Sequence, residues 1–328
     1  MRDGKDFLDM NKSISDKNRI DYKSAILGFA LIFSCIPIFR NYIPDAGEIM
    51  FWNERIIGHL GFCPGATVWR IMLFVSQVLF FVSGLFMFKA LFYKEKEAEN
   101  KVFVGMLLYM FCPYRFAVTY EMYDVSEIAL WVIIPLFVTL FVNGIKRKNG
   151  IFIVASLISL VLAVPFFAVK YVYPNEFFSE GGYTFGQLFS TFFHAEGRPG
   201  IGIALILGLA LWIYYILEGR ERKNKQAIIF ALIGTIFVIM SLKAFPWDFF
   251  CRKSDILMKV IRHLGSPSFF IGLASIAFTL PASYAVADLK DSENKFVSDY
   301  LPVILMVLTV SVWVFLCGKA IYFQYPLE

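Results

Sequence analysis

Apolar stretches of about twenty residues recur along nearly the whole chain, and each has the length of a helix that crosses the hydrocarbon core of a bilayer. Of the 328 residues, 58% are hydrophobic and the mean hydropathy is +0.64, so the polar surface is too small to enclose so much apolar mass in water. The stretches do not alternate apolar with polar residues as barrel strands do. The sequence therefore predicts an all-α integral membrane protein.

The predicted spans number about nine, at roughly twenty apolar residues each. They lie at residues 24–39, 67–92, 102–120, 125–143, 150–170, 200–217, 227–242, 267–288 and 301–323. This divides the chain into a cytoplasmic N-terminal segment (1–23), a polytopic transmembrane domain (24–323) and a short C-terminal tail (324–328). No segment between spans is long enough to fold as a soluble domain, so we expect the function to reside in the membrane or at its outer face.

The chain contains 31 Lys and Arg against 26 Asp and Glu, and most of its basic residues lie in short loops between predicted spans. Basic residues in such loops mark the cytoplasmic side, which predicts a cytoplasmic N-terminus and, with nine spans, a C-terminus outside. Because these charges act as topology signals, we do not expect a nucleic-acid partner. One predicted outside loop departs from the pattern, since it gathers Lys243, Arg252, Lys253, Lys259 and Arg262.

The first predicted outside loop carries two candidate functional acids, Asp45 and Glu48. Glu48, Trp52, Arg55 and His59 are spaced as one stripe of a helix, which fits an interfacial helix with a hydrated polar edge. The alternative is that Asp45 and Glu48 face an active cavity as a catalytic base or as ligands of a hard divalent cation.

A second candidate cluster lies where the third predicted span ends and the fourth begins. Arg115 is followed by Glu121, Asp124 and Glu127, and charges so close to hydrocarbon are costly unless they are paired or hydrated. One interpretation is a structural ion pair of Arg115 with Glu121 or Asp124. Glu127 falls inside the fourth span, so its carboxyl group is expected to face a cavity or another helix.

The basic outside loop follows the segment Phe245-Pro246-Trp247-Asp248. Basic charge on the outer face does not help topology, so attraction to an anionic ligand such as a lipid phosphate is one explanation. The other is an amphipathic interfacial helix whose lysines reach toward water.

Several fragments together resemble the bacterial YfhO-like membrane proteins and related polytopic proteins of the GT-C glycosyltransferase superfamily. The fragments are LLYMFCPYRFAVTYEMYDVSEIALWVIIPL, GGYTFGQLFS, FPWDFF and LGSPSFFIGLAS, in this order. The positions that match the family pattern are Pro113, Tyr114, Arg115, Tyr120, Glu127 and Pro135, then Gly186 to Phe189, and Phe245 to Asp248.

The resemblance implies a GT-C-like fold in a bacterial cytoplasmic membrane and an enzyme of cell-envelope glycan assembly. Such an enzyme transfers a sugar from a polyprenyl-phosphate donor to a glycan acceptor at the outer face. Asp45 or Glu48 would then activate the acceptor hydroxyl or bind Mg²⁺ or Mn²⁺, although a metal is not required. The substrate and lipid-phosphate site would comprise Arg115, Glu127, Asp248, Arg252, Lys253 and Arg262.

The resemblance also makes Arg115 the expected partner of Glu127, because a turn through residues 120–125 would place the third and fourth spans side by side. Two alternatives to an enzyme stay open. The chain could be a transporter or flippase of lipid-linked glycan units, or a non-catalytic subunit of a membrane complex.

Overall fold

The computed structural model describes residues 22–39, 66–95, 97–121, 125–164, 182–188, 200–218, 224–264, 267, 269–289, 298 and 300–324. The elements within these residues are helices, apart from an isolated bridge between Tyr183 and Leu242. In chain order they are α2 (Tyr22–Ser34), α3 (Ile36–Phe39), α5 (Ala66–Leu91), α6 (Ala98–Met110), α7 (Pro113–Phe116), the π-helical turn η3 (Ala117–Glu121), α8 (Val125–Arg147), α9 (Gly150–Val161), α12 (Phe185–Leu188), α13 (Ile203–Leu217), α14 (Lys225–Ser241), α15 (Trp247–Lys253), α16 (Asp255–Leu264), α17 (Phe269–Asp288) and α18 (Leu301–Gln324).

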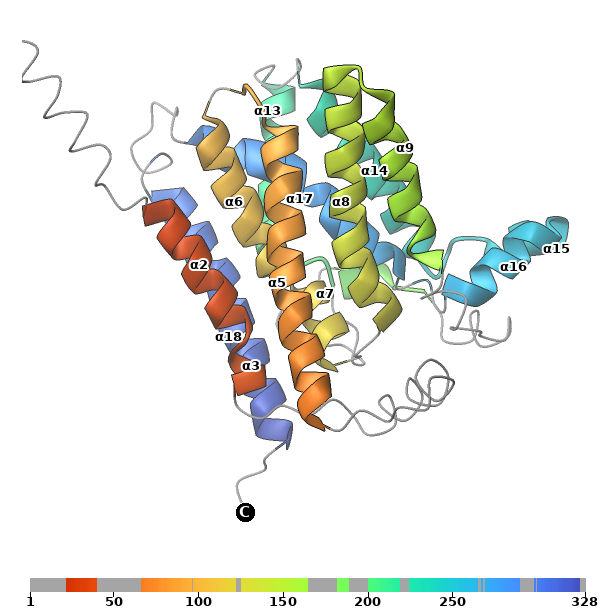
Figure 1. The fold of residues 1–328 in the computed structure, drawn as a ribbon, viewed down its shortest axis with the longest axis horizontal. Coiled ribbons are helices and arrows are strands. Elements are labelled where there is room, and N and C mark those ends of the chain that lie inside the picture. The colour runs from red at the N-terminus through yellow and green to blue at the C-terminus, as the bar shows by residue number, and fades with distance from the viewer. Residues whose placement is uncertain are drawn as a thin grey trace, which may run out of the picture.

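The long helices pack side by side as one bundle (Figure 1). Among the described residues, four helices are long and apolar enough to cross a membrane, within α5, α8, α17 and α18, and α6 with α7 makes a fifth if this bent pair is one span. The apolar helices α2, α9, α13 and α14 are shorter. The prediction of an all-α multi-pass membrane protein is therefore confirmed, and each predicted span overlaps at least one described helix.

Helix α17 forms the centre of the bundle. All but two of its residues are buried, and it packs mainly against α14, α13 and α6. Small residues allow the neighbouring backbones to come close, as is common between membrane helices: an added Cβ at Gly208 would lie 2.7 Å from the Cβ of Ala282. Burial on every side explains why α17 has no polar face.

Charged side chains join several helix termini at one end of the bundle, which we call the cationic end and define by Lys23, Lys101 and Lys146. The Lys23 ammonium lies 3.7 Å from the Glu99 carboxylate, and that of Lys101 lies 3.8 Å from Asp288. The Lys146 ammonium donates a hydrogen bond of 2.8 Å to a carbonyl near the C-terminus of α5. Helices α2 and α6 therefore begin at this end, whereas α5, α8 and α17 end there.

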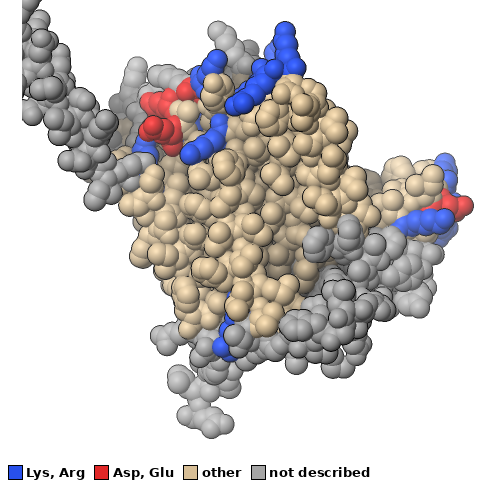
Figure 2. Space-filling view, viewed as in Figure 1, with Lys and Arg blue, Asp and Glu red and all other residues tan. Residues whose placement is uncertain are grey.

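Between the bundle ends, the outward-facing surface is apolar. Figure 2 shows a broad tan band with charges gathered mainly at one end and on a projecting pair of helices. Exposed isoleucine, valine and leucine side chains cover the outer side of α9, where Ile151 is 77% exposed. Such a surface is costly in water and is favourable against lipid chains, which places the band in the bilayer.

Candidate functional site

The candidate site lies at a break between α6 and α7, toward the end of the bundle opposite the cationic end. Pro113 lacks a backbone N–H and holds the preceding residue extended: Cys112 has φ −62° and ψ 124°, and Pro113 opens α7. The two helical pieces meet at a bend of 46°. The bend interrupts the helical ladder inside the bundle, so the carbonyl of Met110 becomes available to another donor.

Arg115 supplies that donor. Its side chain is fully buried, with 0% exposed. Its Nε donates to the Met110 carbonyl at 2.9 Å, its Nη2 donates to the same carbonyl, and its Nη1 donates to Oε1 of Gln77 on α5 at 2.5 Å. The guanidinium therefore links the end of α6 to the middle of α5.

Among the side chains that the structure describes, aromatic rings and polar oxygens surround the charge of Arg115 and no carboxylate pairs with it. Its Cζ lies 4.8 Å from the ring centroid of Trp313 and 5.3 Å from that of Phe80, and the negative faces of aromatic rings attract a cation. The carbonyl that it binds is at the C-terminus of α6, where the helix dipole is also negative. Arg115 thus acts as a cationic cap on a broken helix.

The predicted ion pair between Arg115 and Glu127 is wrong. Glu127 lies in the first turn of α8 and is only 4% exposed. Its Oε2 accepts a hydrogen bond of 2.7 Å from the hydroxyl of Tyr114, the residue before Arg115. The helical turn separates the side chains of consecutive residues by about 100°, so Tyr114 reaches α8 while Arg115 reaches α5 and α18.

The expectation that Glu127 faces another helix is confirmed. Together with Trp131, Phe269 and Gly272 it lines a narrow space between α8 and α17. The positive end of the α8 dipole also stabilises a carboxylate in this position. The third and fourth predicted spans touch through Tyr109 and Trp131, whose ring centroids are 5.3 Å apart, but α8 packs mainly against α5 and α9 and α6 mainly against α17 and α5.

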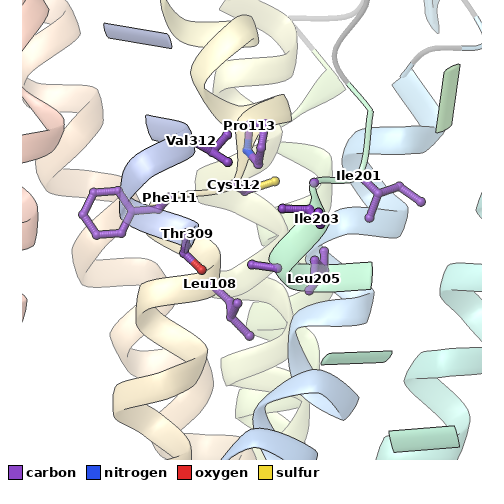
Figure 3. A pocket seen from close by; sticks show the side chains of 11 residues that line it. Leu108, Phe111, Cys112, Pro113, Ile201, Ile203, Leu205, Thr309 and Val312 are labelled. Carbon is purple, nitrogen blue, oxygen red and sulfur yellow. The ribbon is translucent and has the colours of Figure 1, made fainter. Parts of the chain in front are cut away.

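The break leaves little space for a ligand. Figure 3 shows apolar side chains from α6, α13 and α18 around the break, with Cys112 and Thr309 among them. The cavity that they line has a volume of about 10 Å³, close to that of a single water. Because Arg115 is enclosed and its nitrogens donate to protein oxygens, the structure gives it a capping role instead of contact with a phosphate.

The predicted basic loop folds into two short helices, α15 and α16, which project from the bundle (Figure 1). Asp248, Arg252 and Lys253 are exposed, and the Lys253 ammonium lies 4.2 Å from the centroid of the Phe249 ring. Arg262 belongs to α16, but its side chain lies outside the described residues. Arg252 and Lys253 are therefore accessible to an anionic ligand, in contrast to Arg115.

The two helices are attached at the end opposite the cationic end. The Trp247 ring stacks on Phe270 at the start of α17, with centroids 5.3 Å apart, and its Nε1 donates to the carbonyl of Met240 at 2.9 Å. Trp247 and Ile261 are buried in the same apolar cluster as Leu130, one turn after Glu127. The bases of α15 and α16 therefore pack against the helix ends that enclose Glu127.

Asp45 and Glu48 lie outside the described residues, as do Asp124 and the side chain of Glu121. The catalytic base, the Mg²⁺ or Mn²⁺ site and a convergence of all outside loops on one cavity remain predictions. Among the side chains that the structure does place, no group of three or more His, Cys, Asp or Glu residues could hold a metal ion.

Reasoning from sequence missed Gln77, Phe80 and Trp313, the partners of Arg115. A signal for one of them was present: Gln77 is the only amide side chain within α5, and a buried amide inside a span requires a polar partner. The two rings gave no such signal, because an aromatic residue in a span is ordinarily explained by apolar packing.

No protein-family model matches the chain, and comparisons with the curated proteins and with the solved structures likewise find no match.

Proposed function

We propose that this chain is a GT-C-like glycosyltransferase that transfers a sugar from a polyprenyl-phosphate donor to a glycan acceptor at the outer face of a bacterial cytoplasmic membrane. The observation that carries the proposal is the placement of α15 and α16. Exposed cations, Arg252 and Lys253, project from the bundle at the membrane end where the carboxyl group of Glu127 is buried. The surrounding motifs resemble those of GT-C proteins, and this resemblance supports sugar transfer as the proposed reaction.

The proposed roles follow from the charges of the reaction. When the sugar leaves its donor, negative charge grows on the lipid phosphate, and nearby cations stabilise that charge. Arg252, Lys253 and Arg262 would supply this stabilisation. Asp45 or Glu48 would take the proton of the acceptor hydroxyl as the new glycosidic bond forms.

Loss of this activity should appear in the glycans of the cell envelope. We expect cells that lack the protein to accumulate a glycan lighter by one sugar, as measured by mass spectrometry. The wild-type chain should restore the mass, whereas Asp45→Asn or Glu48→Gln should restore it at a rate lower by about 10²- to 10⁴-fold, the usual contribution of a general base.

Lys148→Gln, at the distant C-terminal end of α8, serves as the matched charge control and should restore the mass fully. Envelope glycans that are identical with and without the protein would rule out the proposed transfer.

We also propose that the bundle crosses the membrane about nine times with its cationic end in the cytoplasm. The contacts support this orientation, because Lys23, Lys101 and Lys146 gather at one end as the positive-inside rule requires. Helix α2 begins at that end, and α18 ends at the other (Figure 1).

A reporter fusion tests this topology. Alkaline phosphatase fused after Glu328 is expected to be active, because the enzyme folds only outside the cytoplasm, and green fluorescent protein at the same site is expected to be dark. Fusions after Lys148 should give the reverse. An active phosphatase after Lys148 would contradict the orientation.

A further inference from the structure

We propose that α15 and α16 form an interfacial anchor that lies on the outer leaflet, with apolar side chains in the lipid and cations at the depth of anionic headgroup phosphates. The inference depends on the membrane location of the bundle and on its proposed orientation, and not on the proposed sugar transfer.

The first argument is the amphipathic pattern of α16. Ile256 and Val260 are four residues apart and share one side, and they are 78% and 49% exposed. Asp255 and Lys259, about 100° around the helix from this pair, form a neighbouring polar edge and are exposed as well. Ile261 is buried against the bundle. The apolar side of α16 is thus wider than its contact with the protein, and the uncovered strip requires another apolar environment.

The second argument is the aromatic content of α15. Phe249 and Phe250 are exposed, with ring centroids 5.5 Å apart, and Phe250 stacks on Phe245 at 5.6 Å. Aromatic side chains concentrate where hydrocarbon meets the headgroups. Lys253 reaches over the Phe249 ring, an arrangement in which an apolar ring can enter the lipid while the ammonium stays near the phosphates.

The third argument is position. Helix α15 follows the end of α14, and α17 begins after α16, so the pair connects two helices at a membrane boundary. Helix α17 has 20 residues and is therefore about 30 Å long at 1.5 Å per residue. This length matches the hydrocarbon thickness. Its C-terminus lies at the cationic end through Asp288, so its N-terminus and the attached pair lie near the opposite interface.

The net positive charge of α15 and α16 favours anionic lipids. Arg252, Lys253 and Lys259 are exposed cations on this pair, and the exposed acids Asp248 and Asp255 offset only part of their charge. Cationic amphipathic helices bind more strongly to bilayers that contain anionic lipids. The outer leaflet under the pair should therefore be enriched in anionic headgroups.

Spin-label accessibility of the full-length protein in vesicles provides the test. Ile256→Cys is labelled with a nitroxide, Lys259→Cys on the polar edge of the same helix is the matched control, and the wild-type chain measures labelling of native cysteines. In phosphatidylcholine vesicles with added phosphatidylglycerol, we expect the label at 256 to collide more with oxygen than with a water-soluble nickel complex. The label at 259 should show the reverse.

Four outcomes would overturn the proposal. A label at 256 that collides freely with the nickel complex would mean that the pair is in water. Protection from both reagents would mean that protein covers it. The label at 256 could lie equally deep in vesicles of phosphatidylcholine alone, or its depth could be unchanged after Arg252→Gln with Lys253→Gln. Either result would contradict the role of anionic lipid. Ile256 is largely exposed, so its substitution should not disturb folding. The experiment measures the depth of the spin label in the bilayer, so a negative result would contradict the anchor and would not bear on the glycan experiment.

Discussion

The variant Arg115→Met is expected to lower the free energy of unfolding by about 2–6 kcal/mol, because it leaves two buried acceptors without donors and each such loss costs about 1–3 kcal/mol. Methionine has a similar length and no donor. The Met110 carbonyl and Oε1 of Gln77 would lose their partner. Replacing a buried charge by an apolar group can be neutral when the whole polar set is replaced, but here the two acceptors remain.

The measurement is thermal or denaturant unfolding of the purified protein in detergent, followed by circular dichroism. Arg252→Met is the matched control, because Arg252 is exposed, and a change within about 0.5 kcal/mol is expected there. The double variant Arg115→Met with Gln77→Leu should recover part of the loss, since one orphaned acceptor is removed. If Arg115→Met is as stable as the wild type, Arg115 does not cap α6.

The second large loss of stability is expected for Gly105→Ala, at the point where α5, α6 and α17 meet. An added Cβ would lie 2.7 Å from the ring of Phe88 and 2.8 Å from Oγ of Ser283. The Phe88 ring is fully buried and stacked on Phe92, so it has no room to move. Overpacking of this kind costs about 1–3 kcal/mol, and Gly105→Ala should destabilise the protein by that amount.

Gly28→Ala is the matched control, because nothing lies within 4 Å of a Cβ added at Gly28 in helix α2. Alanine favours a helix interior over glycine by about 0.8–1.0 kcal/mol, so this variant should be equal to the wild type or more stable. The two substitutions should therefore shift the unfolding midpoint in opposite directions. A destabilisation of equal size at both positions would contradict the close packing of α5, α6 and α17 around Gly105.

The sequence predicted the helices well because the requirement of the bilayer is local. Within hydrocarbon each backbone polar group must be satisfied by its own segment, so an apolar stretch of sufficient length becomes a helix whatever its neighbours are. An amphipathic helix was one of the two explanations for the basic loop, and Asp255–Leu264 is helical.

The partners of Arg115 could not be predicted in this way. Arg115 was expected near the end of the third predicted span, with Glu121, Asp124 or Glu127 as its partner. The rotation of α7 about its axis decides which neighbour each side chain meets. That rotation is fixed by the bend at Pro113, by packing against α17 and α18, and by the contact of Arg115 with α5.

The sequence by itself determined that the apolar segments are helices suited to a bilayer and where charge must be compensated, because transfer free energies belong to individual residues. Only the tertiary structure decided how each charge is compensated. It gave Arg115 a carbonyl, an amide and two rings, gave Glu127 a tyrosine hydroxyl, and left Arg252 and Lys253 exposed. The reason is physical: hydrogen bonds and ring contacts act over a few ångströms, and the helices that provide them come from distant parts of the chain.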